Sequence, residues 1–165
     1  MKNIPYLFLI ICLLVFIHPI HAHSSENLEK EIDNILSSAE SLFKAMKDND
    51  HKAIWLYLTS KSKKMIVEDT YKSAIKSGVE YTREQINVDF SIGGLIAKSY
   101  WKGFLSTFNP DIVLEHSTWE MGLVEGNRSE VIITYKKSEK PAILKMFKED
   151  GVWKVGFTET FWTRK

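Results

Sequence analysis

The sequence predicts an α+β domain in which N-terminal helices pack on one face of a curved, C-terminal antiparallel sheet of four strands. Two observations support this prediction. Over residues 25–108 apolar side chains recur at spacings of three and four, as they do along one face of a helix. After Pro110, four apolar runs with strand character are separated by turn signals. Helices followed by strands, without alternation between them, are typical of the α+β class.

The first 22 residues differ from the rest of the chain. Lys2 is followed by an almost entirely apolar run over residues 4–17, and then by Pro19 and the small residue Ala22. This order is that of a secretory signal peptide. We therefore expect cleavage near Ala22 and a single exported domain over residues 23–165. The alternative is an uncleaved membrane anchor, because the apolar run is close to the shortest that spans a bilayer.

Composition excludes several classes of function. Cys12 is the only cysteine and would leave with the signal peptide, so the exported domain would have no disulfide, thiol nucleophile or thiolate metal site. Without Lys2 the chain has 21 basic and 21 acidic residues, and this balance argues against nucleic acid as a partner. The 44% of hydrophobic residues is enough for a core held by packing alone.

The helical half is predicted to contain a series of capped helices. Residues 25–47 form a long amphipathic helix, and Asp50 caps a short second one. Ser60 begins a third helix that ends at Gly78, with an apolar side predicted at Met65, Tyr71, Ala74 and Ile75.

Residues 82–92 match both a helix start and a strand pattern. Thr82 and Gln85 match a capping box, but the alternation of Val88, Phe90 and Ile92 predicts a strand, so that any helix here is short or absent. Helical spacing resumes over residues 95–108 and stops at Asn109-Pro110.

The strand half is predicted from four runs and three turns. The strands are expected at residues 112–124, 129–137, 142–147 and 152–162. The turns between them contain Gly126, Ser138 and Asp150-Gly151. Val131 and Ile133 should share one face of their strand, and Trp153, Val155 and Phe157 one face of the last.

Three stretches carry a resemblance to a known fold. They are "AESLFKAMKDNDHKAIWLYLT" (39–59), "NRSEVIITYKK" (127–137) and "PAILKMFKEDGVWKVGF" (141–157). They resemble nuclear transport factor 2-like domains, in particular small exported bacterial members of the lumazine-binding-like type, many of unknown function. The resemblance implies a cone-shaped domain with an apolar pocket, a periplasmic or secreted location, and possible homodimers. Residues 60–108 hold more helix than is usual in the family, so the mouth of the pocket is expected to be partly filled.

The resemblance also suggests where a catalytic base would lie. Isomerases, dehydratases and cyclases of this family place an Asp or His inside the cone, beside aromatic residues. In this chain His116 and Asp89 are the candidates, and His116 is expected on the first strand near Trp119. A base in such a cavity would have a pKa moved toward neutrality by desolvation. The plainer interpretation is a partly buried, hydrogen-bonded histidine for His116 and a solvated aspartate at a strand end for Asp89.

Binding residues are predicted mainly among the aromatic side chains, most of which should form the core. A ligand pocket is expected around Trp101, Trp119, His116 and Tyr135, and a partner contact at Phe161 and Trp162. We expect no metal, because no closely spaced set of ligands is visible, and no cofactor.

The first functional hypothesis is a non-enzymatic exported domain that binds a small apolar ligand or a protein partner. It is preferred because no acid and base can be placed together. The alternatives are an enzyme that uses His116 or Asp89, and an assembly component held at a membrane by an uncleaved N-terminal segment.

Overall fold

The computed structural model describes residues 20–162, with side chains from Glu26 onward. The helices are α1 (Ile20–Lys47), α2 (His51–Tyr57), α3 (Ser60–Lys76), α4 (Arg83–Ile92), α5 (Leu95–Leu105), α6 (Pro110–Glu115) and α7 (Phe157–Phe161). The strands are β1 (Ser117–Glu125), β2 (Arg128–Tyr135), β3 (Ala142–Glu149) and β4 (Val152–Val155). Most of the predicted signal peptide lies outside the described residues, and cleavage near Ala22 stays a prediction. No helix within residues 20–162 is long and apolar enough to cross a membrane.

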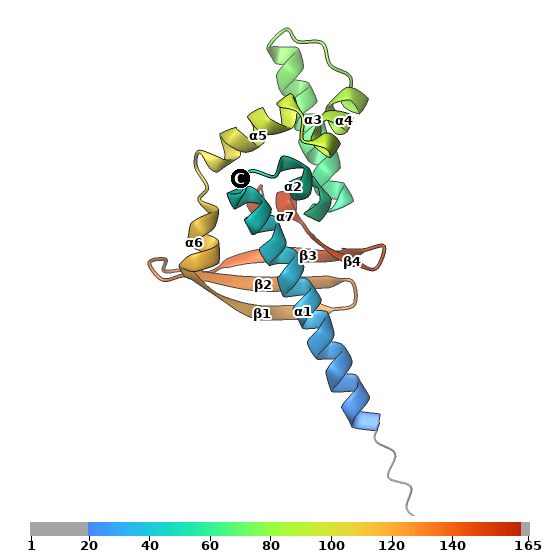
Figure 1. Cartoon of the computed structure of the whole chain (residues 1–165), viewed down its shortest axis with the longest axis vertical. Helices are drawn as coiled ribbons and strands as arrows, with labels where there is room; N and C mark the ends of the chain where they lie inside the picture. Colours follow the sequence, from blue (N-terminus) through green and yellow to red (C-terminus); the bar gives the residue numbers. More distant parts are fainter. Residues whose placement is uncertain (1–19, 163–165) are drawn as a thin grey trace, which may run out of the picture.

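The four strands form an antiparallel meander in the order β1-β2-β3-β4, and the sheet is open (Figure 1). This confirms the predicted α+β class and the predicted strand order. Asp150 and Gly151 connect β3 to β4 with positive φ angles of 51° and 78°. Two central residues with positive φ define the two-residue hairpin whose twist matches that of the strands it joins. The turn signal read from the sequence therefore fixes the register of the last hairpin.

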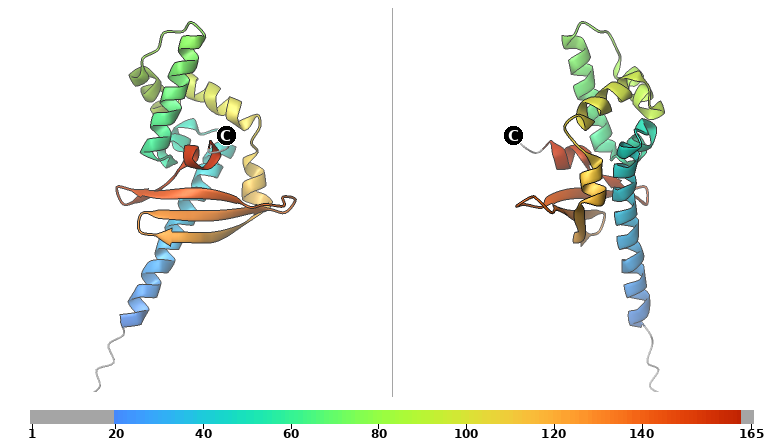
Figure 2. Two further views of the ribbon diagram at one scale, coloured as in Figure 1. Left: turned by 180° about the vertical axis from the view of Figure 1, so that it is seen from behind. Right: turned by 60° about the vertical axis from the view of Figure 1, so that its left-hand side comes forward.

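Helix α1 packs along one face of the sheet, α6 lies against α1, β1 and β2, and the remaining helices extend the domain beyond β4 (Figures 1 and 2). The Ser38 hydroxyl on α1 donates a hydrogen bond of 2.6 Å to the Trp153 carbonyl on β4. The face of the sheet that α1 covers is apolar and buried: Val131, Ile133, Leu144, Met146, Trp153 and Val155. Helices α2 to α5 and α7 form a second layer of packing on the β4 side of the sheet.

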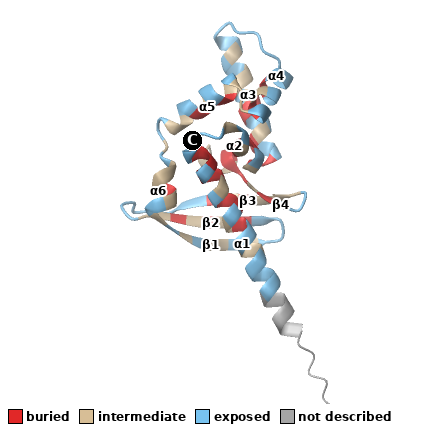
Figure 3. Cartoon of the chain, viewed as in Figure 1, coloured by how far each residue is buried: buried red, intermediate tan, exposed pale blue. Residues whose placement is uncertain are grey.

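A cluster of aromatic rings joins these helices. Figure 3 shows where buried residues lie along them. Phe157, the first residue of α7, is fully buried, and its ring centroid lies 5.3 Å from that of Trp101 and 4.9 Å from that of Phe104 on α5. Phe161 extends the cluster to Phe104 and Phe108. Each ring removes a large apolar area from water, so α7 closes the core of the helical layer.

Helix α4 corrects the prediction of a strand around Val88. The capping box is confirmed, since the Thr82 side chain accepts from the Gln85 amide and the Gln85 side chain accepts from the Thr82 amide. The segment that follows is a helix through Ile92. Phe90 is buried against α2 through the Trp55 ring, whereas Val88 is exposed. The apolar alternation arose because this short helix exposes apolar side chains on its outer face.

Two other predicted strands are shorter than expected. The Asn109 side chain accepts from the Asp111 amide and Pro110 occupies the first turn, so the chain enters α6 before β1 begins at Ser117. The last strand ends at Val155, and Phe157 lies in α7 instead of on the face of β4.

Glu31 connects α1 to the last hairpin, and this contact should make stability depend on pH. Its Oε1 accepts hydrogen bonds from Lys148 Nζ (2.6 Å) and Trp153 Nε1 (3.0 Å). These contacts, the Lys148 bond most of all, lower the pKa of Glu31 from its ordinary value of 4.5, although burial acts in the opposite direction. A lowered folded-state pKa stabilises the fold above the unfolded-state value, and this contribution is lost as the pH falls through the folded-state pKa.

We expect Glu31→Gln to lower the free energy of unfolding by about 1 kcal/mol at pH 7, because the charge-assisted bond to Lys148 is replaced by a neutral one. The difference from the natural protein should shrink as the pH falls below the ordinary value of 4.5 and through the lowered pKa of Glu31, because Glu31 then becomes neutral. Urea denaturation across this pH range measures the difference in the free energy of unfolding. Glu29→Gln changes an exposed carboxylate on the same helix and is the matched control. A difference that does not vary with pH would contradict the ionic contribution.

Candidate functional site

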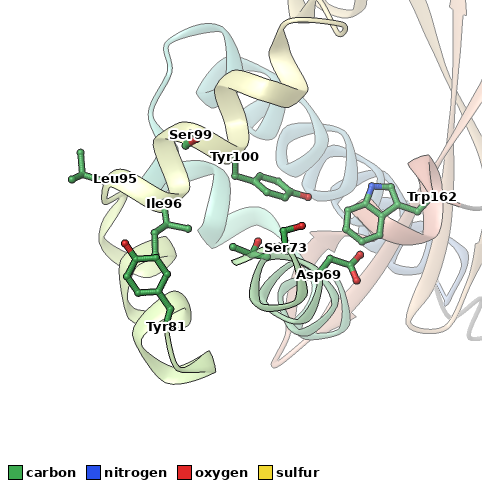
Figure 4. Close-up of a pocket in the computed structure, with 9 residues that line it drawn as sticks. Asp69, Ser73, Tyr81, Leu95, Ile96, Ser99, Tyr100 and Trp162 are labelled. Carbon is green, nitrogen blue, oxygen red and sulfur yellow. The ribbon is translucent and has the colours of Figure 1, made fainter. Parts of the chain in front are cut away.

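The candidate site is a cleft of about 480 Å³ between α3, α5 and the end of α7 (Figure 4). This volume lies in the range of small-molecule sites in proteins. The cleft is lined by Asp69, Thr70, Ser73, Tyr81, Leu95, Ile96, Ser99, Tyr100 and Trp162. Aromatic and aliphatic walls with a few hydroxyl groups and one carboxylate are the composition expected of a ligand site.

Helices α3 and α5 form two walls of the cleft, and helical spacing directs several of their side chains into it. Asp69 and Ser73 are four residues apart on α3, and Ile96 and Tyr100 are four residues apart on α5. Side chains at this spacing lie on the same face of a helix, one turn apart. Tyr81, in the connection between α3 and α4, closes the end of the cleft that the start of α5 also lines.

The third wall depends on how α7 is held. Ser62, buried on α3, donates a 2.9 Å hydrogen bond to Glu159 Oε2 and accepts a 3.2 Å bond from the Thr158 amide. The Thr158 hydroxyl donates to the same carboxylate oxygen at 2.9 Å. The Trp162 amide donates to the Thr158 carbonyl at 3.1 Å. This network, which we call the Glu159 network, fixes α7 against α3 and so places Trp162 at the cleft.

Among the hydroxyl groups of the cleft, those of Tyr100 and Thr70 make no hydrogen bond to the protein within the described residues. The Tyr100 ring packs edge-on against Phe90 (5.3 Å) and Trp101 (5.1 Å), and Figure 4 shows its hydroxyl directed toward the Trp162 end of the cleft. Burial raises the pKa of Tyr100, and the negative charge of Asp69 raises it further, so the phenol stays protonated. The Thr70 hydroxyl is buried without a hydrogen bond. The Tyr100 hydroxyl, which faces the cleft in Figure 4, is available to a ligand.

The four residues predicted to surround a ligand pocket lie in two separate regions of the structure. His116 follows α6 and is exposed, and its carbonyl accepts from the Lys136 amide. Tyr135 is half-buried at the nearby end of β2, and the Trp119 indole donates to the Val113 carbonyl at 2.9 Å. Trp119 lines a separate hollow of about 440 Å³ beside α1, which we call the α1 hollow. Trp101 lies elsewhere, fully buried among the rings of α5 and α7.

Among the other predicted residues, only Trp162 lines the cleft. Phe161 belongs to the aromatic cluster of the core. Asp89 is half-buried in α4, and its Oδ1 accepts a 2.8 Å hydrogen bond from the Ala97 amide in the first turn of α5. Gly94 makes this possible, because a Cβ at that position would collide with the Asp89 carboxylate. Asp89 thus acts as the cap of α5, supplied by the preceding helix.

Capping predicts the behaviour of Asp89 variants. Asp89→Ala should lower the free energy of unfolding by about 1 kcal/mol, because an amide at the start of α5 loses its acceptor. Asp89→Asn keeps an oxygen in the same place and should lose clearly less. Thermal or urea denaturation followed by circular dichroism measures both. If the two variants are as stable as the natural protein, the cap contributes nothing and a different role for this carboxylate has to be sought.

The residues that sequence reasoning missed are Asp69, Thr70, Tyr81 and, as a cleft residue, Tyr100. The first two were assigned to no site because α3 was expected to turn a different side toward the core. The i, i+4 pairs on α3 and α5 were the available signal. Nothing in the sequence shows that α7 returns to meet them, so the three walls could not be combined.

Metal binding is not indicated in the part of the chain that the structure describes: no group of three or more His, Cys, Asp or Glu side chains there is placed to hold an ion. Comparisons of the chain with protein-family models, with curated proteins and with solved structures found no match. The resemblance to nuclear transport factor 2-like domains therefore stays a prediction.

Proposed function

We propose that this chain is an exported, non-enzymatic domain that binds a small, largely apolar ligand in the cleft between α3, α5 and α7. The observation that supports it best is the cleft itself, with aromatic side chains from three separate segments and hydroxyl groups that have no protein partner. A non-enzymatic role is favoured over the enzymatic alternative because of what surrounds the two candidate bases. His116 is exposed, and Asp89 is engaged as a helix cap.

Ligand binding in the cleft can be tested with a variant whose larger side chain occupies the cleft. Ser73 is exposed on the α3 wall, so Ser73→Trp should occupy the cleft without disturbing the core. The probe is N-phenyl-1-naphthylamine, a neutral dye whose fluorescence rises in apolar sites. We expect saturable binding to the natural protein and at least tenfold weaker binding to Ser73→Trp, with unchanged urea denaturation.

A matched variant tests the competing location. Ser37 lines the α1 hollow beside Trp119, and Ser37→Trp should fill that hollow and leave dye binding unchanged. If Ser37→Trp abolishes binding and Ser73→Trp does not, the ligand site lies at the α1 hollow and the proposed cleft is wrong. Absence of saturable dye binding to the natural protein would contradict a preformed apolar site.

Export is the other part of the proposal, and it is supported by the pattern of residues 1–22. When the full chain is expressed in a bacterium with a periplasm, we expect the exported protein to have an intact mass that lacks about these residues. A mass that retains them would favour the membrane-anchored alternative, in which the same domain works at a membrane surface.

A further inference from the structure

The cleft contains one charged side chain, and it is not neutralised by the protein. Asp69 is exposed on α3 and is the only charged residue among those that line the cleft. No ion pair to Asp69 is found within the described residues. The preceding residue differs in this respect, because the Glu68 carboxylate forms ion pairs with Arg83 at 2.6 Å and with Lys72 at 3.7 Å. The cleft therefore carries a net negative charge that a bound molecule has to accommodate.

The electrostatic influence of this carboxylate reaches the interior of the cleft. The Asp69 charge adds to burial in raising the pKa of Tyr100, whose hydroxyl is directed toward the same end (Figure 4). Walls of low polarity on either side concentrate the field of a charge in a cleft. A cation placed between Asp69 and Tyr100 would be stabilised by that field, and an anion would be repelled.

The aromatic residues divide the cleft into two ends. Figure 4 shows Trp162 near Asp69 and the Tyr100 hydroxyl, whereas Tyr81 lies with Ile96 at the opposite end. Indole and phenol faces attract cations through their quadrupole, and ammonium groups are bound between such faces and carboxylates. The opposite end is formed mainly by Leu95, Ile96 and the Tyr81 ring, with Ser99 beside them, and this suits a hydrocarbon or aromatic group (Figure 4).

The three classes of ligand differ in what they do to Asp69. A neutral ligand would desolvate the carboxylate without giving it a partner, which costs free energy. An anion would add repulsion to that cost. A cation would replace the lost hydration with an ion pair, reinforced by the Tyr100 oxygen as an acceptor and by the Trp162 ring.

We propose that the ligand of this cleft is a small organic cation, with a protonated amine beside Asp69, Tyr100 and Trp162 and an apolar or aromatic body against Tyr81 and Ile96. This inference rests on the proposed function, because it assigns a ligand class to the same cleft. The volume of about 480 Å³ accommodates a molecule of this kind.

The test uses three probes that share a phenylalkyl group and differ in the charge of the terminal group: 4-phenylbutylamine, 4-phenyl-1-butanol and 4-phenylbutyrate. At pH 7 they are a cation, a neutral molecule and an anion. Titration followed by calorimetry or by protein NMR should show the amine binding at least tenfold more tightly than the alcohol, and the carboxylate most weakly. Asp69→Asn should remove the advantage of the amine, and the alcohol should bind at least as tightly as before, because it no longer desolvates a carboxylate. Asp48→Asn, which neutralises an exposed carboxylate between α1 and α2, should alter neither.

The outcomes separate this inference from the proposal on which it rests. If the amine and the alcohol bind equally and Ser73→Trp weakens both, the cleft binds ligands but the cation inference is overturned. Tighter binding of 4-phenylbutyrate would overturn it as well. If none of the three probes binds, the inference falls, and binding of the neutral dye decides the proposed function independently.

Discussion

Phe157→Ala should reduce the free energy of unfolding by about 3–5 kcal/mol, the loss typical of removing a fully buried aromatic ring. Phe157 contacts Trp101, Phe104 and Phe161 in one cluster, so the cavity left behind would lie where three rings meet. Domains of this size are stable by only about 5–15 kcal/mol, and the variant is therefore expected to be close to unfolded at 37 °C. Urea denaturation followed by circular dichroism gives the measurement.

Two further variants serve as controls for the stability loss expected of Phe157→Ala. Phe157→Leu keeps most of the apolar volume and should lose clearly less stability, which keeps the comparison possible if the alanine variant does not fold. Leu123→Ala removes a side chain of β1 that is 56% exposed and should change the free energy of unfolding by less than about 0.5 kcal/mol. Equal losses for Phe157→Ala and Leu123→Ala would show that α7 does not complete the core.

Glu159→Ala should lower the free energy of unfolding by about 2–3 kcal/mol, because a largely buried acceptor of two hydroxyl groups is lost. The side chain of Glu159 is only 11% exposed, and its Oε2 accepts from the buried hydroxyl groups of Ser62 and Thr158. The alanine variant removes two charge-assisted hydrogen bonds and leaves two buried donors without that acceptor. Because the Glu159 network holds α7 against α3, ligand binding at Trp162 should weaken together with stability.

Glu159→Gln distinguishes hydrogen bonding from charge. A glutamine oxygen in the place of Oε2 can accept from both hydroxyl groups, so the loss should be less than half that of the alanine variant. The ion pair to Lys61 is long, at 3.7 Å, and the Lys61 side chain is 68% exposed, so it should contribute little. Similar losses for the two variants would assign the effect to charge instead of to the hydroxyl contacts.

The features that sequence predicted well are those set by local chemistry. Asp50 caps α2 by accepting from the Ala53 amide, the Thr82 capping box is formed, and Asp150-Gly151 makes the last hairpin turn. Each of these depends on a few neighbouring residues, so no knowledge of the tertiary structure is needed to recognise it.

Prediction failed where tertiary packing decides which side of an element is buried. On α3 the buried residues are Ser62, Ile66 and Val67, whereas Met65 and Ile75 from the predicted apolar side are exposed. The helix meets α4 and α7, and neither had been placed against it. The predicted fourth strand ran too far for the same reason, since Phe157 begins α7 and packs on the rings of α5 instead of continuing the strand.

The candidate site was predictable only in part. Trp162 was expected to make a contact because the sheet did not account for it, and it does line the cleft. Asp69 resembled an ordinary solvated residue, and Trp101 was expected at a ligand but is part of the core. Buried and cleft-lining tryptophans have the same local sequence signals, so only the packing of α5 against α7 separates them.

The position of α7 also determines when the domain can fold during synthesis. It follows every other described element along the chain, yet Phe157 fills the centre of a cluster supplied by α5, which is made much earlier. Contacts between such distant segments form late, because the intervening chain has to be closed first. A nascent chain that stops before Phe157 can form its local helices and hairpins but lacks a complete core. Folding is therefore expected to be completed only after α7 is synthesised, which leaves the growing chain open to chaperones, proteases or a translocation machinery until that moment.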